Sequence, residues 1–185
     1  FSLPLTPLRP VLCPVSASVV SDRMALKALD GLRVRARLTL TRNHEELWCE
    51  DGEVLFRTFG ISGVAAFNLS RRIQHGDTIL LDIFPDLSKD ELLDMLNRRV
   101  ELLGRFSPHD PRWFDGMLAP QLSRVVCTAF ERCHPGSNDV IHLVSILKHF
   151  KLLAEGTAEE RSAQVVRGGI SIESVSAPDL RATAT

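Results

Sequence analysis

A ten-residue alternation constrains the fold of this chain more than any other feature of its sequence. From Leu32 to Thr41, apolar side chains alternate with arginine or threonine. This is the pattern of a β-strand with one buried and one solvated face. Asn43-His44 is expected to turn the chain after it, and Asp51-Gly52 predicts a hairpin a little further on. A further strand is expected over 78–84, so the first half of the chain is predicted to be antiparallel β-structure.

A turn containing two glycines lies within this β-rich half. The apolar run 54–56 leads into Gly60 and Gly63, and a mostly apolar segment continues from 64 to 70. We expect a strand, a tight turn, and then a short helix or a second buried strand. Ser62 is expected to cap the segment after the turn. Glycine adopts positive φ without steric cost, so the backbone at this turn is expected to approach another group closely.

Helical periodicity replaces the β-pattern after Pro85. Apolar residues then recur at three- and four-residue intervals, which predicts amphipathic helices. Three helices are expected: one from the capping box Ser88–Glu91 to Gly104, one from Pro120 to the stop at 134–136, and one capped by Ser137 or Asn138 and carrying apolar residues as far as Phe150. These helices form one compact unit in this interpretation.

The two ends of the chain are predicted to be extended. Four prolines within residues 1–15 favour polyproline II or an edge strand lying on a surface. A short strand is expected over 163–166, running into Arg167-Gly168-Gly169. The order β, α, β indicates a helical unit inserted into a β-unit.

Composition and charge exclude several classes of protein. The chain has 185 residues with 44% hydrophobic and 24% charged residues, which is ordinary for a globular protein and excludes wholesale disorder. A net charge of −1 argues against dedicated nucleic-acid binding. No run of eighteen apolar residues predicts a membrane span.

The cysteines and the N-terminus bear on the origin of the chain. The four cysteines lie far apart, which favours reduced thiols and a cytoplasmic location. The N-terminus lacks both an initiator Met and a signal peptide, so the chain is expected to be a piece of a longer polypeptide.

The motifs that carry chemistry are weak. Gly60-Ile61-Ser62-Gly63 is not a nucleophile elbow, because position 64 is Val where a glycine is needed. Cys127 and Cys133 are too far apart for a zinc pair, so no metal is expected. Three arginines alternate along the first strand and form either a solvated face or a basic stripe for an anionic partner: Arg33, Arg35 and Arg37. No G-x-G-x-x-G, P-loop or H-E-x-x-H is present.

Four segments, in this order, resemble the BaiN-like (aminoacetone oxidase) family of bacterial FAD-dependent NAD(P)/FAD oxidoreductases. They are the proline-rich Pro7–Val15; Gly52-Glu53-Val54-Leu55-Phe56-Arg57-Thr58-Phe59-Gly60-Ile61-Ser62-Gly63 with Asn68-Leu69-Ser70-Arg71; the helical unit; and Ala163-Gln164-Val165-Val166-Arg167-Gly168-Gly169-Ile170. The second segment is the most specific. The sequence departs from the family at Val64, Thr58 and Val166, where Pro, His and Thr are common.

The resemblance covers nearly the whole chain, but only the insert that divides the family's FAD-binding domain. It implies an α+β fold with an antiparallel β-barrel-like subdomain (1–85 and 162–185) and an inserted helical subdomain (86–161). It also implies that Gly168 and Gly169 lie near the flavin of the full-length protein. The residues implied to line its substrate pocket are Thr58, Phe59, Gly60, Ser62 and Gly63.

The expected function is therefore that of a flavin-covering insert, which is not catalytic in isolation. Its partner is the split FAD-binding domain of the same polypeptide, and FAD is expected in that parent rather than on this chain alone. No nucleic acid, membrane or metal partner is expected. The alternative is a stand-alone module that binds an anionic partner through the strand face of Arg33, Arg35 and Arg37. A hydrolase using Ser62 is the third and least favoured interpretation.

Overall fold

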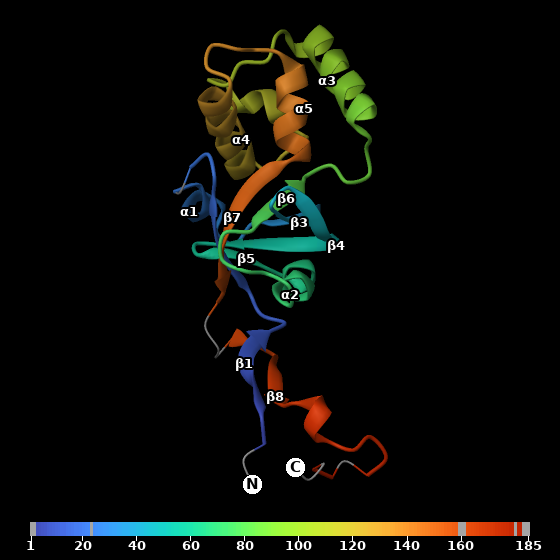
Figure 1. The fold of residues 1–185 in the computed structure, drawn as a ribbon. Coiled ribbons are helices and arrows are strands. Elements are labelled where there is room, and N and C mark those ends of the chain that lie inside the picture. The colour runs from blue at the N-terminus through green and yellow to red at the C-terminus, as the bar shows by residue number, and fades with distance from the viewer. Residues whose placement is uncertain (1–2, 23, 159–161, 180, 183–185) are drawn as a thin grey trace.

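A closed six-stranded antiparallel barrel forms the centre of the molecule (Figure 1). The computed structural model describes residues 3–22, 24–158, 162–179 and 181–182. Around the barrel the strands follow the order β2-β5-β4-β3-β6-β7. Their bounds are β2 Val15–Val19, β3 Arg33–Arg42, β4 Glu45–Arg57, β5 Gly60–Ser62, β6 Thr78–Asp82 and β7 Phe150–Thr157. Together with the helices described below, this confirms the predicted α+β class and its antiparallel barrel.

The strand predicted over 32–41 is β3, and its alternation has the expected consequence. Ala36, Leu38 and Leu40 are fully buried in the barrel, whereas the arginines between them face outward. Asn43 and His44, with φ of 51° and 69°, form the two-residue turn into β4. Positive φ at both central positions is the signature of the tight hairpin turn whose twist matches its flanking strands.

The hairpin predicted at Asp51-Gly52 is wrong, because both residues lie inside the long strand β4. The role of Gly52 is to allow close packing of a helix on this strand. A Cβ at this position would lie 3.1 Å from the Cβ of Ala65, so the missing side chain lets helix α2 (Val64–Ser70) rest closely on the strand. A short-range turn signal was overridden here by a tertiary contact.

The helical unit lies at one end of the barrel (Figure 1). It contains α3 Lys89–Leu103, the 3₁₀ turn η1 Pro111–Phe114, α4 Pro120–Cys133 and α5 Val140–Lys148. The predicted capping box is present, since Ser88 Oγ accepts from the Glu91 N–H and the Glu91 carboxylate accepts from the Ser88 N–H. Phe106 lies at the centre of this unit, with edge-to-face contacts to Trp113, Phe114 and Phe130. Helix α1, Ala25–Leu29, connects β2 to β3 and contacts α4.

The third helix is shorter than predicted. Asp139 caps it, accepting from the Ile141 N–H, in place of Ser137 or Asn138. The helix ends at Lys148, and Phe150 begins β7, which pairs with β2 and β6 and closes the barrel. Apolar residues at 150, 152 and 154 alternate as in a strand. Because they directly follow a helical pattern, the sequence alone did not indicate where the helix ends and the strand begins.

A two-stranded ribbon projects from the other end of the barrel (Figure 1). It pairs β1 Leu5–Val11 antiparallel with β8 Val165–Ile170, so the extended segments predicted near the two chain ends lie side by side. The 3₁₀ turn η3, Ile172–Ser174, follows β8. Among the residues that the structure describes, no helix is long and apolar enough to cross a bilayer.

Candidate functional site

The glycine turn after β4 is held by two close backbone contacts. A Cβ at Gly60, whose φ is 155°, would lie 1.9 Å from the carbonyl oxygen of Val15. A Cβ at Gly63, whose φ is 97°, would lie 2.6 Å from the carbonyl oxygen of Glu53. The predicted order of strand, turn and short helix is confirmed, and the group that the two glycines approach is the barrel backbone itself.

The five residues assigned by resemblance to a substrate pocket remain together at this turn. The Thr58 N–H donates to Asp30 Oδ1 at 3.0 Å, and the Phe59 carbonyl accepts from the Ala17 N–H at 3.0 Å. The Phe59 ring is 42% exposed. Helix α2 begins after Gly63 without a side-chain cap, so the expected capping by Ser62 is wrong. Within the described part of the chain, no hydrogen bond joins the Ser62 hydroxyl to a histidine or a carboxylate, and a serine nucleophile has no base here.

The two ribbon glycines differ in their surroundings. Gly168, with φ of 114°, lies opposite an irregularity in β1, and a Cβ there would come within 2.4 Å of the Pro7 carbonyl oxygen. Gly169, with φ of 118°, would place a Cβ in open space. A side chain at position 168 would clash within the ribbon, which explains the glycine there. Contacts within the described part of the chain do not explain the glycine at position 169.

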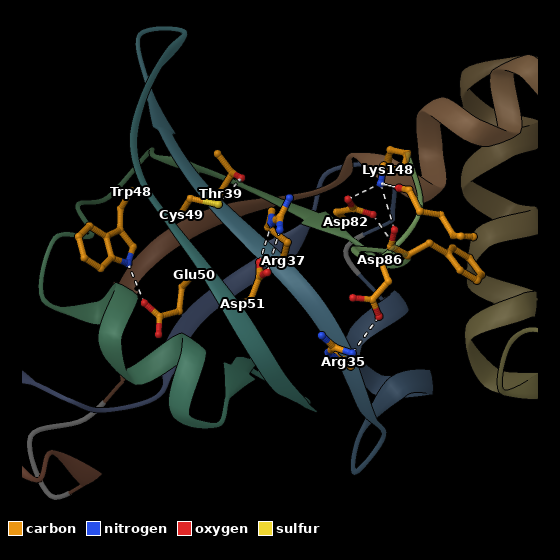
Figure 2. A network of polar contacts seen from close by, with 12 residues as sticks. Arg35, Arg37, Thr39, Trp48, Cys49, Glu50, Asp51, Asp82, Asp86 and Lys148 are labelled. Atoms are coloured by element: carbon orange, nitrogen blue, oxygen red, sulfur yellow. Dashed lines mark hydrogen bonds and ion pairs between the residues drawn. The ribbon is translucent and has the colours of Figure 1, made fainter. Parts of the chain in front are cut away.

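The arginines of β3 form ion pairs along the outer face of the barrel (Figure 2). Arg37 makes a bidentate contact with Asp51 at 2.6 and 2.8 Å, Arg35 meets Asp86 at 2.8 Å, and Arg33 meets Glu53. The hydrogen bonds from Arg37 hold the pKa of Asp51 below its usual range. Each expected cation thus faces a carboxylate, and this face carries alternating charge rather than a basic stripe.

The histidines and cysteines do not gather into a metal centre. His134 and His142 stack with ring centroids 4.1 Å apart, and Ser137 Oγ lies 3.3 Å from His142 Nδ1. Over the described ranges of the chain, no group of three His, Cys, Asp or Glu side chains is placed to hold a metal ion. Burial raises the pKa of the Cys127 thiol to about 11, so this cysteine is a packed thiol rather than a ligand or nucleophile.

A family model described as the HI0933-like protein barrel and H2TH domain matches residues 9–108. The chain belongs to this family. The match runs from the middle of β1 to the loop after α3, and so spans most of the barrel and the glycine turn. The HI0933-like family is associated with FAD-dependent oxidoreductases. This match therefore supports the resemblance to flavoproteins, and it does so at the level of the HI0933-like family.

The sequence of this HI0933-like chain lacks the usual motif of a dinucleotide site. The glycine fingerprint that cradles a dinucleotide pyrophosphate is missing from the sequence. Gly168 and Gly169 lie on a ribbon of which most residues are exposed. We therefore derive no catalytic step through a flavin for this chain.

Sequence reasoning missed one group of residues that the fold assembles. Arg9, Arg42, Arg71, Arg72 and Arg167 come from four separate segments and line a single hollow where the ribbon leaves the barrel. Only the adjacent pair Arg71-Arg72 was visible in the sequence. The other members meet it through the pairing of β1 with β8 and through the loop after α2.

Proposed function

We propose that this chain is the flavin-covering and substrate-pocket insert of a BaiN-like bacterial FAD-dependent oxidoreductase, and that it is not catalytic on its own. The rest of that enzyme, a split FAD-binding domain in the same polypeptide, is its partner. FAD supplies the redox chemistry when it is bound by that domain. The role of this chain is to cover the cofactor and exclude water from its reactive face.

The single observation that carries the proposal is the ribbon. Its two strands leave the barrel together, with Val11 opposite Val165 at the base and Leu5 opposite Ile170 near the tip. A domain inserted into another domain needs such a pair of adjacent connections. Each strand has one partner in the ribbon, so its outer edge is available for pairing with a further strand.

The side chains of the ribbon support the same proposal. Leu5, Leu8 and Ile170 are 72%, 69% and 52% exposed, and Val165 and Val166 are also exposed. Apolar side chains on a free ribbon of two strands gain little stability from one another. Burial against a neighbouring domain would remove them from water, at about 25 cal/mol per Å² of apolar surface.

The division into subdomains fits this arrangement. We propose that 1–85 and 162–185 belong to a β-rich part and 86–161 to a helical part, although β7, within the second range, is a strand of the barrel. In this proposal the turn of Thr58, Phe59, Gly60, Ser62 and Gly63 contributes to the substrate pocket, and the backbone at Gly168 and Gly169 lies near the flavin.

Flavin retention in the longer polypeptide tests the proposal. Gly169→Ala is expected to lower flavin content and turnover, because the new methyl group would point into space reserved for the cofactor. Gly116→Ala is the matched control, since Gly116 also has a positive φ, 81°, and equally open surroundings, and it lies in the helical unit. Equal flavin content in the two variants would refute the placement of Gly169. Gly168→Ala is less informative, because its methyl group would clash with Pro7 of the ribbon itself.

The alternative of an anion-binding strand face receives no comparable support. Arg33, Arg35 and Arg37 are each engaged by a carboxylate. An anionic partner would have to displace these contacts before it could bind.

A further inference from the structure

A hollow rich in arginine lies at the base of the ribbon, and we call it the arginine hollow. It has a volume of about 750 Å³. Its lining residues include Arg9 from β1, Arg42 from β3, Arg71 and Arg72 from the end of α2, and Arg167 from β8, with His75 beside them. No aspartate or glutamate is among its lining residues. Five arginines from four separate segments therefore line one concave surface of a chain whose net charge is −1.

Most of these charges have no counterion among the residues that the structure describes. Among the residues that the structure describes, no carboxylate lies within 4.0 Å of the guanidinium nitrogens of Arg9, Arg71, Arg72 or Arg167. The arginines of β3 on the outer barrel face are all paired, as described above. The hollow thus differs from the outer face of β3, where Arg33, Arg35 and Arg37 each meet a carboxylate.

Two of the arginines oppose each other directly. Arg9 and Arg167 are partners in the β1–β8 ladder, and like charges at directly opposite positions destabilise a sheet. Arg167 also reaches across the hollow, where its Nη1 donates to the Arg71 carbonyl at 3.4 Å. Arg71 follows the C-terminal end of α2, where the helix dipole favours a positive charge. This effect does not explain why Arg9 and Arg167 face each other. A bound anion between them would convert the repulsion into attraction.

Two of the lining arginines, Arg42 and Arg72, are held by contacts with neighbouring residues. Arg42 Nε donates to Asp77 Oδ1 at 2.7 Å, and Asp77 is almost completely buried. A second bond from Arg42 reaches the Arg72 carbonyl at 3.2 Å. The Arg72 guanidinium lies flat over the Trp48 ring, 3.5 Å from its centroid, and its Nη1 atom is buried without a hydrogen-bond partner. A buried donor without a partner costs free energy.

Part of the wall of the hollow is apolar, although Ser70, Gln74 and Thr157 also line it. Pro10, Val11, Leu47 and Ile73 line it beside the arginines. A second hollow of about 600 Å³ adjoins it and shares Val11, Arg71, Arg72 and Arg167. The shared arginines therefore lie between the two hollows. This arrangement suits a ligand whose charged group contacts the arginines and whose carbon skeleton contacts the apolar residues.

From these observations we propose that the arginine hollow binds the phosphate groups of a small phosphorylated molecule. Guanidinium forks match phosphate oxygens in bidentate geometry, and a diphosphate offers enough acceptors for several of them at once. The inference concerns the side chains of this chain alone and does not depend on the flavoenzyme proposal.

Calorimetric titration of the 185-residue chain with inorganic pyrophosphate tests this inference. We expect one pyrophosphate per chain, with an affinity that falls as chloride is added. Arg71→Ala, Arg167→Ala and Arg9→Ala are each expected to weaken binding about tenfold, because each removes a charged hydrogen-bond donor. All three residues are exposed, so the variants should fold. Arg35→Ala is the matched control, as Arg35 is equally exposed but lies outside the hollow and is paired with Asp86.

Several results would overturn the inference. One is the absence of pyrophosphate binding at low ionic strength. Another is an equal loss of affinity in Arg35→Ala and Arg71→Ala, which would indicate diffuse attraction to surface charge. A third is binding of citrate at matched ionic strength with the affinity of pyrophosphate, since this would remove the preference for phosphate.

Discussion

Lys148 and Asp82 form a buried ion pair between the helical unit and the barrel, with Nζ and Oδ2 2.5 Å apart (Figure 2). Lys148 is the last residue of α5, and Asp82 is the last residue of β6. The ammonium group also donates to the carbonyls of Phe84 and Leu87, at 3.0 and 2.5 Å. One side chain thus ties together the strand end, the connection to α3 and the helix that returns to the barrel.

This pair predicts a specific pattern of stability changes. Lys148→Met should lower the free energy of unfolding by about 3–5 kcal/mol, because it leaves a buried carboxylate and two carbonyls without their donor. Asp82→Asn should cost less, since the ammonium keeps both carbonyl acceptors. The double variant should cost less than the sum of the two single variants. Urea denaturation measures all three, and strict additivity would contradict the coupling.

A second prediction concerns the glycine turn. Gly60→Ala should destabilise the chain by about 3 kcal/mol or more, because the added methyl group would overlap the Val15 carbonyl across the β2–β5 pairing. Gly76→Ala is the control for positive φ alone, since Gly76 has φ of 87° and no atom within 4 Å of the new Cβ. Similar thermal melting temperatures for the two variants would show that the contact is unimportant.

The turn between β3 and β4 offers a stabilising substitution. His44 adopts φ of 69°, a conformation that costs an L-residue about 1–2 kcal/mol and glycine almost nothing. After the larger unfolded-state entropy of glycine is allowed for, His44→Gly should raise the free energy of unfolding by about 0.5–1 kcal/mol. Glu46→Gly, two residues later in β4, should lower it by a similar amount. A loss of stability in His44→Gly would contradict the turn geometry.

The buried carboxylate of Asp77 predicts a pH dependence. Burial alone raises the pKa of Asp77, but the hydrogen bonds from Arg42 and the Gln74 N–H and the charge of Arg42 outweigh it, so the net pKa lies below 3.8. Because the folded-state pKa is the lower one, the pair contributes its stability fully above about pH 4 and loses it as the pH falls through the folded-state pKa.

Asp77→Asn should therefore cost roughly 2 kcal/mol at neutral pH, and the difference from the unmodified chain should shrink as the solution is acidified. Unfolding measured across this pH range provides the test. Asp86→Asn is the control, because the Asp86 side chain is 68% exposed and exposed pairs contribute little. A difference that stayed constant with pH would refute the linkage.

Local signals in the sequence predicted the elements whose structure depends on near neighbours. The alternation of β3 and the capping box of α3 needed no distant contact, and both are confirmed. The helix of 120–133, opened by Pro120, is confirmed for the same reason.

The features that depend on distant contacts were not predictable from the sequence. Asp51-Gly52 resembles a turn, but pairing with β3 and packing under α2 keep it extended. Phe150 resembles the end of a helix, but it pairs with Leu81 of β6, which makes it the start of a strand, and that strand also pairs with the distant β2. The arginine hollow was not predictable for the same reason. Arg9 and Arg167 lie opposite each other only because β1 and β8, from distant parts of the sequence, form one ribbon.

The most direct test of the proposed flavoenzyme role is the intact mass of the native polypeptide from its source cell, measured together with its visible absorption spectrum. We predict a polypeptide well above 20.6 kDa that contains these peptides and carries the yellow absorption of a bound flavin. A colourless native protein of 20.6 kDa would contradict the proposal, and the chain would then act as a binding module on its own.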